Sequence, residues 1–553
     1  MRNGLWEDTT SKRRKRYEYI IRESELLSIP LKDSVYIKND TDADEIVIRD
    51  VTTYVLAPAM NDFILWVLGS AIKKGHRRLY FLARDGYFMY KTALVYCEKL
   101  GLDIDCRYLS CSRYSVRVPM YHMDMEEALD YICRGGIDVT FDKVLGRAGL
   151  DSDAKKALGN RLLDRWDTPD VIPYSSLGEL KKDLSCDRSF MEMAEEVSKQ
   201  RFPDLKGYLE DEGLLEDIPC ALVDSGWTGS MQKVLSKLLG KIKDDGKLVR
   251  LQGYYWGLYE LPADVDPEDY YCYFFAPGYG AKRKTGFSNC LFEGVFSAPH
   301  GMTLCYEKMR EKMGNDSLSA GDTPAERGDR KERIVPVYAD IREDNLQFNR
   351  MTEKHLSAYT EKLCEVIKIK TGENASPGKD INRLFLKTVS SLRTQSTCCE
   401  HQRMGKICKL LSSGKGIVCQ RGNTGAGKRS TFKKYTDREV VSRLMETFMS
   451  TPTVREAEVY GALPFSDDVL DENEQQIAAR LTPEELRSNH PWRKAAIMLG
   501  ISKGRLKESA WYEGSAVRSG TGIRRNLTAY KLYKMMVYIK KEAARLGAVI
   551  KNN

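Results

Sequence analysis

The chain has 553 residues, of which 42% are hydrophobic and 30% are charged, and its formal net charge at pH 7 is +8. This composition is that of a soluble, core-forming globular protein, and the length predicts about three domains. The net charge is small for the length, and much of it lies in the run Lys12–Arg16. We interpret that run as a solvated tail, so nucleic acid is not an expected partner.

The first elements along the chain predict a location as well as a fold. Residues 1–50 are polar and mixed, lack the apolar region of a signal peptide, and are interpreted as a strap leading into the first domain. The apolar stretch 51–72 contains a proline, Asn61 and Asp62, which predicts a core helix over about 58–74 rather than a membrane span. Fourteen scattered cysteines favour reduced thiols. Together these features predict a cytoplasmic protein without a transmembrane segment.

Strand and helix patterns then alternate as in an α/β domain. Apolar runs predict strands at 78–83, 104–110, 221–224 and 247–259. Between the second and third strands the pattern is helical with polar breaks, one of them near Pro203. The order predicts an α/β domain with a parallel sheet over 51–305 and a helical insertion at 120–213.

The remainder of the chain has a different composition. Few apolar residues occur around 310–333, and we interpret 306–334 as a linker. The region 335–553 has mostly helical patterns, ending in a basic helix over 524–546. We therefore predict a mostly α-helical C-terminal half.

Two segments of the α/β domain share one outline: an apolar strand, a short turn with glycine, and an immediate helix. The first strand leads into Arg84-Asp85-Gly86, and the second contains Asp224-Ser225-Gly226-Trp227-Thr228-Gly229-Ser230. Small residues that open a helix after a strand expose backbone N–H groups, and the helix dipole adds to their attraction for anions. Two such turns in one sheet predict a site for a phosphorylated molecule.

Taken together, these residues resemble the phosphoribosyltransferase fold, and the Asp224–Ser230 form resembles phosphoribosyltransferase-like domains of bacterial gene clusters. The resemblance implies that Leu79–Gly86 is the pyrophosphate loop, that the strand ending at Arg113 follows it, and that Val223–Ser230 is the signature loop. A phosphoribosyl or sugar-phosphate ligand and Mg²⁺ are implied with it. Ser225 stands where the signature loop usually has a second acid, so the resemblance leaves open whether the site is catalytic.

The resemblance also implies a role for each site residue. Asp224 and Asp85 are the candidate catalytic residues, with Asp224 accepting hydrogen bonds from ribose hydroxyls. Arg84 and Arg113 would face pyrophosphate, where a planar guanidinium suits bidentate contact. The candidate ligand-binding residues are Arg84, Gly86, Arg113, Ser225, Gly226, Thr228, Gly229 and Ser230.

A second resemblance covers roughly residues 50–520. The phrases Tyr80–Gly86, Asp224–Ser230, Phe296–Gly301 and Trp511–Ser515 resemble bacterial proteins described as predicted haloacid-dehalogenase-superfamily hydrolases. Those proteins often accompany glycosyltransferases of cell-surface polysaccharide synthesis, which makes such enzymes expected partners. Hydrolysis in that superfamily needs a nucleophilic Asp two residues before a second acid. If Asp85 is the second acid, the nucleophile position holds Ala83, so a phosphatase is disfavoured.

Other interpretations remain open beside these. The fold could serve a non-catalytic interaction protein that tethers polysaccharide enzymes, or the turns could be ordinary α/β architecture. Gly422–Lys428 matches a phosphate-binding P-loop up to its lysine, but Arg429 follows where Ser or Thr is needed. Adjacent Cys398 and Cys399 are poorly spaced for zinc. His300, in a Pro-His-Gly turn, is interpreted as a structural histidine rather than a general base.

Overall fold

The computed structural model describes most of the first 460 residues. The described ranges are 3–32, 42–309, 333–373, 380–392 and 435–460, except 136–138, 169–170, 244–248, 278, 281–282, 285–286 and 342, together with Met535 and Ile539. Four features noted in the sequence lie outside them: the glycine-rich segment 422–428, the cysteine-bearing segment 398–419, the motif 511–515 and, apart from those two residues, the helix 524–546.

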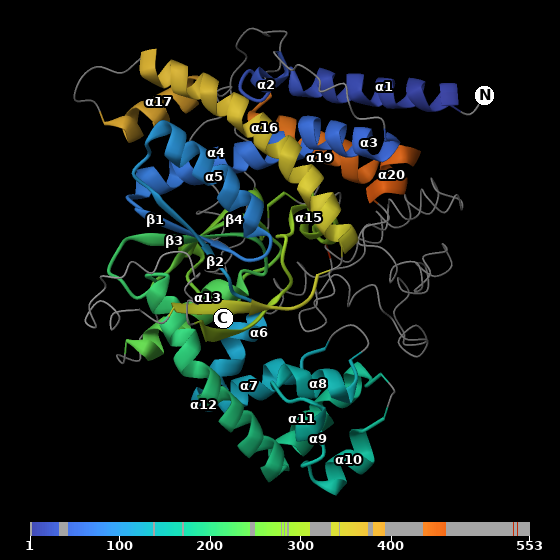
Figure 1. Ribbon diagram of the computed structural model, residues 1–553, viewed down its shortest axis with the longest axis vertical. Helices are drawn as coiled ribbons and strands as arrows, with labels where there is room; N and C mark the ends of the chain where they lie inside the picture. Colours follow the sequence, from blue (N-terminus) through green and yellow to red (C-terminus); the bar gives the residue numbers. More distant parts are fainter. Residues whose placement is uncertain are drawn as a thin grey trace, which may run out of the picture.

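A parallel sheet of five strands forms the centre of the protein (Figure 1). Its order is β2-β1-β3-β4-β5, and every neighbouring pair is parallel. The strands are β1 (Arg78–Leu82), β2 (Asp105–Leu109), β3 (Cys220–Trp227), β4 (Gln252–Leu258) and β5 (Tyr270–Phe275). The predicted α/β class is confirmed, whereas β5, rich in aromatic residues, was not predicted.

Helices from both ends of the chain cover one face of the sheet (Figure 1). They are α1 (Asn3–Ile21), α2 (Ile29–Lys32), α3 (Ala43–Val51), the π-helical turn η1 (Thr52–Leu56), α4 (Ala57–Lys74), α5 (Gly86–Leu100), α15 (Asn289–Phe296), α16 (Glu343–Glu373), α17 (Ile381–Leu392), α19 (Asp437–Ser450) and α20 (Val454–Tyr460). Their apolar side chains share one core with Leu79, Phe81 and Val223 of the sheet. The helices after 335 are therefore part of the same folded unit.

The N-terminal segment differs from the strap and solvated tail that we expected. It is helical, and Tyr17, Ile20 and Ile21 of α1 are buried. Arg13 is also buried, with its Nε 3.1 Å from Glu456 Oε1 of α20 and a second nitrogen donating to the Thr447 carbonyl. Burial of a charge requires such partners, which lie more than 400 residues away in the sequence.

Helix α4 confirms the predicted core helix. The polar groups that argued against a membrane span are hydrogen-bonded inside the core: Asn61 donates to the Ala57 carbonyl and Tyr273 donates to Asp62. Of the described helices, the continuous run Ala43–Lys74 is long and apolar enough to cross a membrane, but 83% of its most apolar window is buried in the protein. A mostly buried core helix can meet the same criteria of length and composition.

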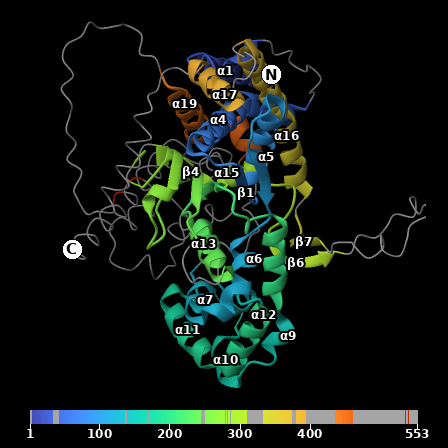
Figure 2. The same cartoon turned by 90° about the vertical axis from the view of Figure 1, so that its left-hand side faces the viewer.

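The opposite face of the sheet carries α13 (Ser230–Ile242) and the end of the helical insertion. The insertion contains α6 (Arg113–Arg117), η2 (Val118–Met123), α7 (Met125–Ile132), α8 (Phe141–Arg147), α9 (Ser152–Lys155), α10 (Asn160–Trp166), η3 (Tyr174–Ser176), α11 (Leu177–Cys186) and α12 (Arg188–Asp211). It has its own hydrophobic core and projects away from the sheet (Figure 2). The break predicted near Pro203 is wrong, because α12 continues through that proline.

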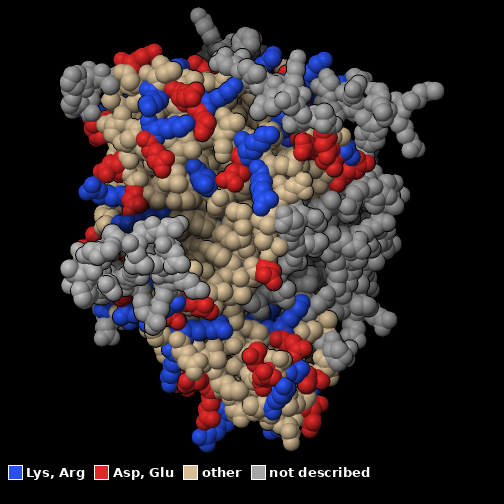
Figure 3. Space-filling view, viewed as in Figure 1, with Lys and Arg blue, Asp and Glu red and all other residues tan. Residues whose placement is uncertain are grey.

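The linker expected at 306–334 begins and ends in strands. β6 (Thr303–Met309) and β7 (Arg333–Tyr338) pair as an antiparallel hairpin that packs against α12. A short 3₁₀ turn, η4 (Pro267–Asp269), precedes β5. On the face shown in Figure 3, charged side chains gather over the upper helices and the insertion, while the band between them is hollowed and mainly uncharged.

Candidate functional site

The candidate site lies where the direction of the sheet connections reverses. Helix α5 follows β1 and packs on one face, with Leu79 and Phe81, whereas α13 follows β3 and packs on the other, with Tyr80 and Leu82. Because β1 and β3 are parallel neighbours, their carboxyl ends lie at one edge of the sheet. In open α/β sheets this position is where ligands bind.

Two predicted acids meet there. Ser225 Oγ donates to Asp85 Oδ2 at 2.5 Å, and the backbone N–H of Ser225 donates to Asp224 Oδ1 at 2.8 Å. Asp85 precedes the first residue of α5, Gly86, so the positive end of the helix dipole favours its charge. The two strand–turn–helix segments therefore meet at Asp85, Asp224 and Ser225.

The neighbourhood keeps Asp224 partly protonated at neutral pH. Burial raises the pKa of this carboxyl to about 7, and the adjacent Asp85 charge adds to the effect. The Ser225 hydrogen bond and the Arg113 charge lower the same pKa, but by less. Two carboxylates this close resist simultaneous ionisation, which is a frequent property of groups that exchange protons or bind cations.

A third acid, Glu293 of α15, completes a cluster that we call the carboxylate cluster (Asp85, Asp224 and Glu293). Trp227 Nε1 donates to Glu293 Oε1 at 2.5 Å. Burial, followed by the Asp85 charge, raises the pKa of Glu293 to about 8. All three acids are only half-buried, so solvent reaches part of each.

Both predicted arginines lie beside this cluster. The positive charge of Arg113 lowers the pKa of Asp224, and Arg113 and Arg84 both lower that of Glu293. Arg113 is the first residue of α6, whose start is fixed by a capping box in which Ser112 and Ser115 exchange hydrogen bonds. The arrangement joins two guanidinium groups and three carboxyls at one end of β1, β2 and β3.

The signature-type turn differs from the expected loop. Strand β3 does not end at Asp224; it continues through Ser225 and Gly226 to Trp227, in register with Gly257 and Leu258 of β4. Gly226 has φ 109°, and a side chain there would place Cβ 2.6 Å from the Gly257 carbonyl oxygen. Glycine is required at this position because no other residue fits.

Thr228, Gly229 and Ser230 consequently lie beyond the end of the strand. The backbone N–H of Thr228 donates to the Gly226 carbonyl at 2.9 Å, so that group is already used within the turn. Gly229 has φ 62°, and a Cβ there would lie 2.8 Å from the ring of Tyr270 on β5. Gly229 therefore packs closely against Tyr270, between the last residue of β3 and the first residue of α13.

Three rings, those of Tyr108, His300 and Tyr338, lie together beside the same edge of the sheet. Tyr108 OH lies 2.9 Å from His300 Nε2, and the His300 ring stacks on Tyr338 with centroids 4.0 Å apart. His300 Nδ1 lies 2.8 Å from the Gly301 carbonyl, which can only accept, so Nδ1 carries the proton and Nε2 accepts from Tyr108. Burial lowers the pKa of His300, which keeps the ring neutral.

The cluster has ligand chemistry for a hard cation, although not a complete cage. Carboxylate oxygens are preferred by Mg²⁺, and Asp85 and Asp224 supply them. Among the residues that the structure describes, no three His, Cys, Asp or Glu side chains form a group that could hold a metal alone. Mg²⁺ is often held by one or two carboxylates together with ligand phosphates, and this site fits that mode.

Two functional candidates were missed in the sequence. Glu293 is the single charged residue of Asn289–Phe296, an otherwise mostly apolar helix, and that isolation is the signal that could have identified it. Trp227 was read as part of a loop, although it positions Glu293. His300 was noted, but its place beside β2 was not predicted.

Comparison with known proteins finds no family model that matches the chain and no curated protein with significant similarity. The class shown directly is an α/β protein with a parallel five-stranded sheet.

Proposed function

We propose that the chain binds a phosphorylated sugar or phosphoribosyl ligand, with Mg²⁺, at the carboxylate cluster. The observation that carries the proposal is the meeting of Asp85, Asp224 and Glu293 with Arg84 and Arg113 at the reversal point of the sheet. Guanidinium groups would hold phosphate oxygens, and carboxylates would accept from sugar hydroxyls. Mg²⁺, held by Asp85 and Asp224, would neutralise phosphate charge.

Asp224 is the residue through which such a site could also catalyse transfer. A carboxyl with a pKa of about 7 can accept or supply a proton near neutral pH. Its negative form would stabilise the positive charge that develops on a sugar carbon as a leaving group departs. A transferase linked to bacterial cell-surface polysaccharide synthesis, acting in the cytoplasm with glycosyltransferases of that pathway, is the activity proposed.

The interaction protein remains the second candidate because of one observation. In the turn Thr228–Ser230, which would cradle a phosphate in a phosphoribosyltransferase-like site, the Thr228 N–H already donates to Gly226 and Gly229 packs against Tyr270. A tether that retained the fold without the chemistry would tolerate this loss of a donor. A haloacid-dehalogenase-like phosphatase stays disfavoured, since Ala83 has no nucleophile.

Thermal-shift screening separates the first two candidates. Phosphoribosyl pyrophosphate and nucleotide sugars, each with MgCl₂, should stabilise the wild-type chain by about 2.7 kcal/mol at a hundredfold excess over Kd. Arg113→Ala should lose most of this shift. Asp103→Asn, an exposed change at the opposite edge of the sheet, is the matched control and should keep it. Absence of a shift with every ligand would favour the tether.

A further inference from the structure

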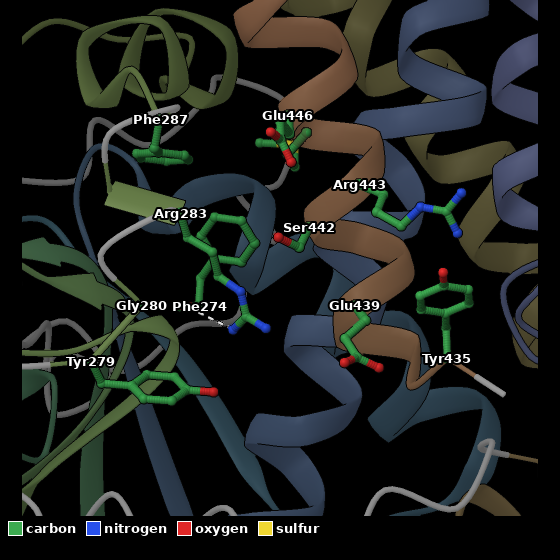
Figure 4. Close-up of a pocket in the computed structure, with 11 residues that line it drawn as sticks. Phe274, Tyr279, Gly280, Arg283, Phe287, Tyr435, Glu439, Ser442, Arg443 and Glu446 are labelled. Carbon is green, nitrogen blue, oxygen red and sulfur yellow. Dashed lines mark hydrogen bonds between the residues drawn. The ribbon is translucent and has the colours of Figure 1, made fainter. Parts of the chain in front are cut away.

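A separate cavity of about 420 Å³ lies between α19 and the segment that follows β5 (Figure 4). Its size is in the range of small-molecule sites. One wall is aromatic, with Phe274, Tyr279 and Phe287, and the other is the polar face of α19. None of these residues belongs to the carboxylate cluster.

The aromatic wall is held in place by packing and by one arginine. Phe274 and Phe287 are buried, with ring centroids 5.7 Å apart and planes inclined by 51°. Arg283 donates to the Phe274 carbonyl at 3.0 Å, and its guanidinium lies 5.5 Å from the Phe274 ring and 5.8 Å from that of Tyr279. A guanidinium has five N–H donors, so donors remain for a ligand. The rings of Phe274 and Phe287 are inclined and in contact, so no space is left between them in which a planar base could stack.

Helix α19 presents Glu439, Ser442 and Glu446 to the same space, at spacings that place them on one helix face (Figure 4). Arg443 is directed elsewhere: its guanidinium lies 4.6 Å from the Tyr435 ring and it pairs with Glu23. Glu439 and Glu446 are exposed, and Glu439 also accepts from the Thr436 N–H, so two carboxylates border the cavity opposite one guanidinium. An anionic ligand such as a phosphate is disfavoured by that balance.

We propose that this cavity binds an uncharged, polyhydroxylated ring, that is, one glycosyl unit of a carbohydrate. The C–H face of a sugar would pack on the partly exposed Tyr279 ring, and its hydroxyls would donate to Glu439 and Glu446 and accept from Arg283. The mixture of donors and acceptors beside an aromatic side chain suits such a ring.

The cavity is connected to the carboxylate cluster through one residue. The Phe287 ring lies 5.5 Å from that of Trp227, whose Nε1 donates to Glu293. Because Phe287 and Trp227 are buried, they separate a glycosyl unit here from a ligand at the carboxylate cluster. Binding of the sugar therefore does not rest on the proposed function.

Saturation-transfer-difference NMR on the full chain tests the inference, with glucose, galactose and N-acetylglucosamine as probes. At least one probe should give a saturable signal, and Ser442→Phe, which places a ring in the cavity, should weaken its affinity by about tenfold or more. Glu446→Gln, an exposed change that spares the fold, should weaken it severalfold. Glu365→Gln, an exposed change on α16, is the control and should have no effect.

The same experiment keeps this inference distinct from the proposed function. Asp224→Asn should leave the sugar signal unchanged, and Ser442→Phe should leave the shift with phosphoribosyl pyrophosphate unchanged. The inference is overturned if no sugar gives a saturable signal, or if both cavity variants bind as the wild type does. Loss of phosphoribosyl binding alone would overturn only the proposed function.

Discussion

The two strand–turn–helix segments look alike in sequence, yet the structure uses them differently. After β1 the chain turns at once, and Asp85 stands immediately before α5. After Asp224 the strand continues for three residues, and the turn that follows lies against Tyr270. The acids therefore meet, while the two glycine-bearing turns do not act as a pair. The difference shows that strand length, rather than the motif, decides which residues share a site.

The largest effect on stability is expected at Gly226, the glycine through which β3 continues to Trp227. Gly226→Ala combines φ 109° with a Cβ 2.6 Å from a backbone oxygen, so the free energy of unfolding should fall by about 3 kcal/mol or more. Gly101→Ala is the control, since φ is 66° there but nothing lies within 4 Å. It should lose about 1 kcal/mol. Equal losses in urea unfolding would contradict the crowded geometry of β3.

A smaller effect, with the opposite sign, is expected at Asp224. Its folded pKa of about 7 exceeds the ordinary value of 3.8, so the folded state binds the proton more tightly than the unfolded state. This contribution is fully present below pH 4 and is lost as the pH rises to about 7. Asp224→Asn should therefore be more stable than the wild type at pH 8, by about 2 kcal/mol after allowance for solvent contact.

The check on that variant is its pH dependence. At pH 4 the neutral carboxyl and the amide should give similar stabilities in urea unfolding. A variant that is less stable than the wild type at pH 8 would mean that Asp224 is not strained by burial and by Asp85.

A substitution of Asp85 tests the interaction between Asp85 and Asp224. Asp85→Asn removes the charge that helps to raise the pKa of Asp224, which should fall by about one pH unit in a carboxyl ¹³C NMR titration. Asp103→Asn should leave that titration unchanged. If both variants titrate alike, the two acids do not interact.

These contacts also show how far the sequence could be read. The apolar runs were sufficient to predict β1 to β4 and to place both glycine-bearing turns in one sheet, because these inferences depend on local pattern and on general topology. Ser225-Gly226-Trp227 resembles a turn, and only pairing with β4 makes it a strand. Glu293 and the Arg13–Glu456 pair join residues far apart in the chain, and no local pattern specifies such contacts.

The smallest effect is expected at the second turn. Thr228→Ala should change the stability by no more than about 0.5 kcal/mol and the ligand affinity by no more than about twofold, because the residue follows the last residue of β3 and its N–H is used within the turn. Isothermal titration with phosphoribosyl pyrophosphate measures the affinity, with Arg113→Ala as the comparison. A loss at Thr228 as large as that at Arg113 would restore the turn as a phosphate cradle.

The most direct test of the carboxylate cluster as a Mg²⁺-dependent ligand site is the same titration at pH 6 and pH 8 with MgCl₂. Cation binding requires ionised Asp224, so the wild-type affinity should rise by about tenfold between these pH values. Asp224→Asn should bind weakly, with no such rise. An absence of binding by the wild type at both pH values, or an equal rise in the variant, would contradict the account.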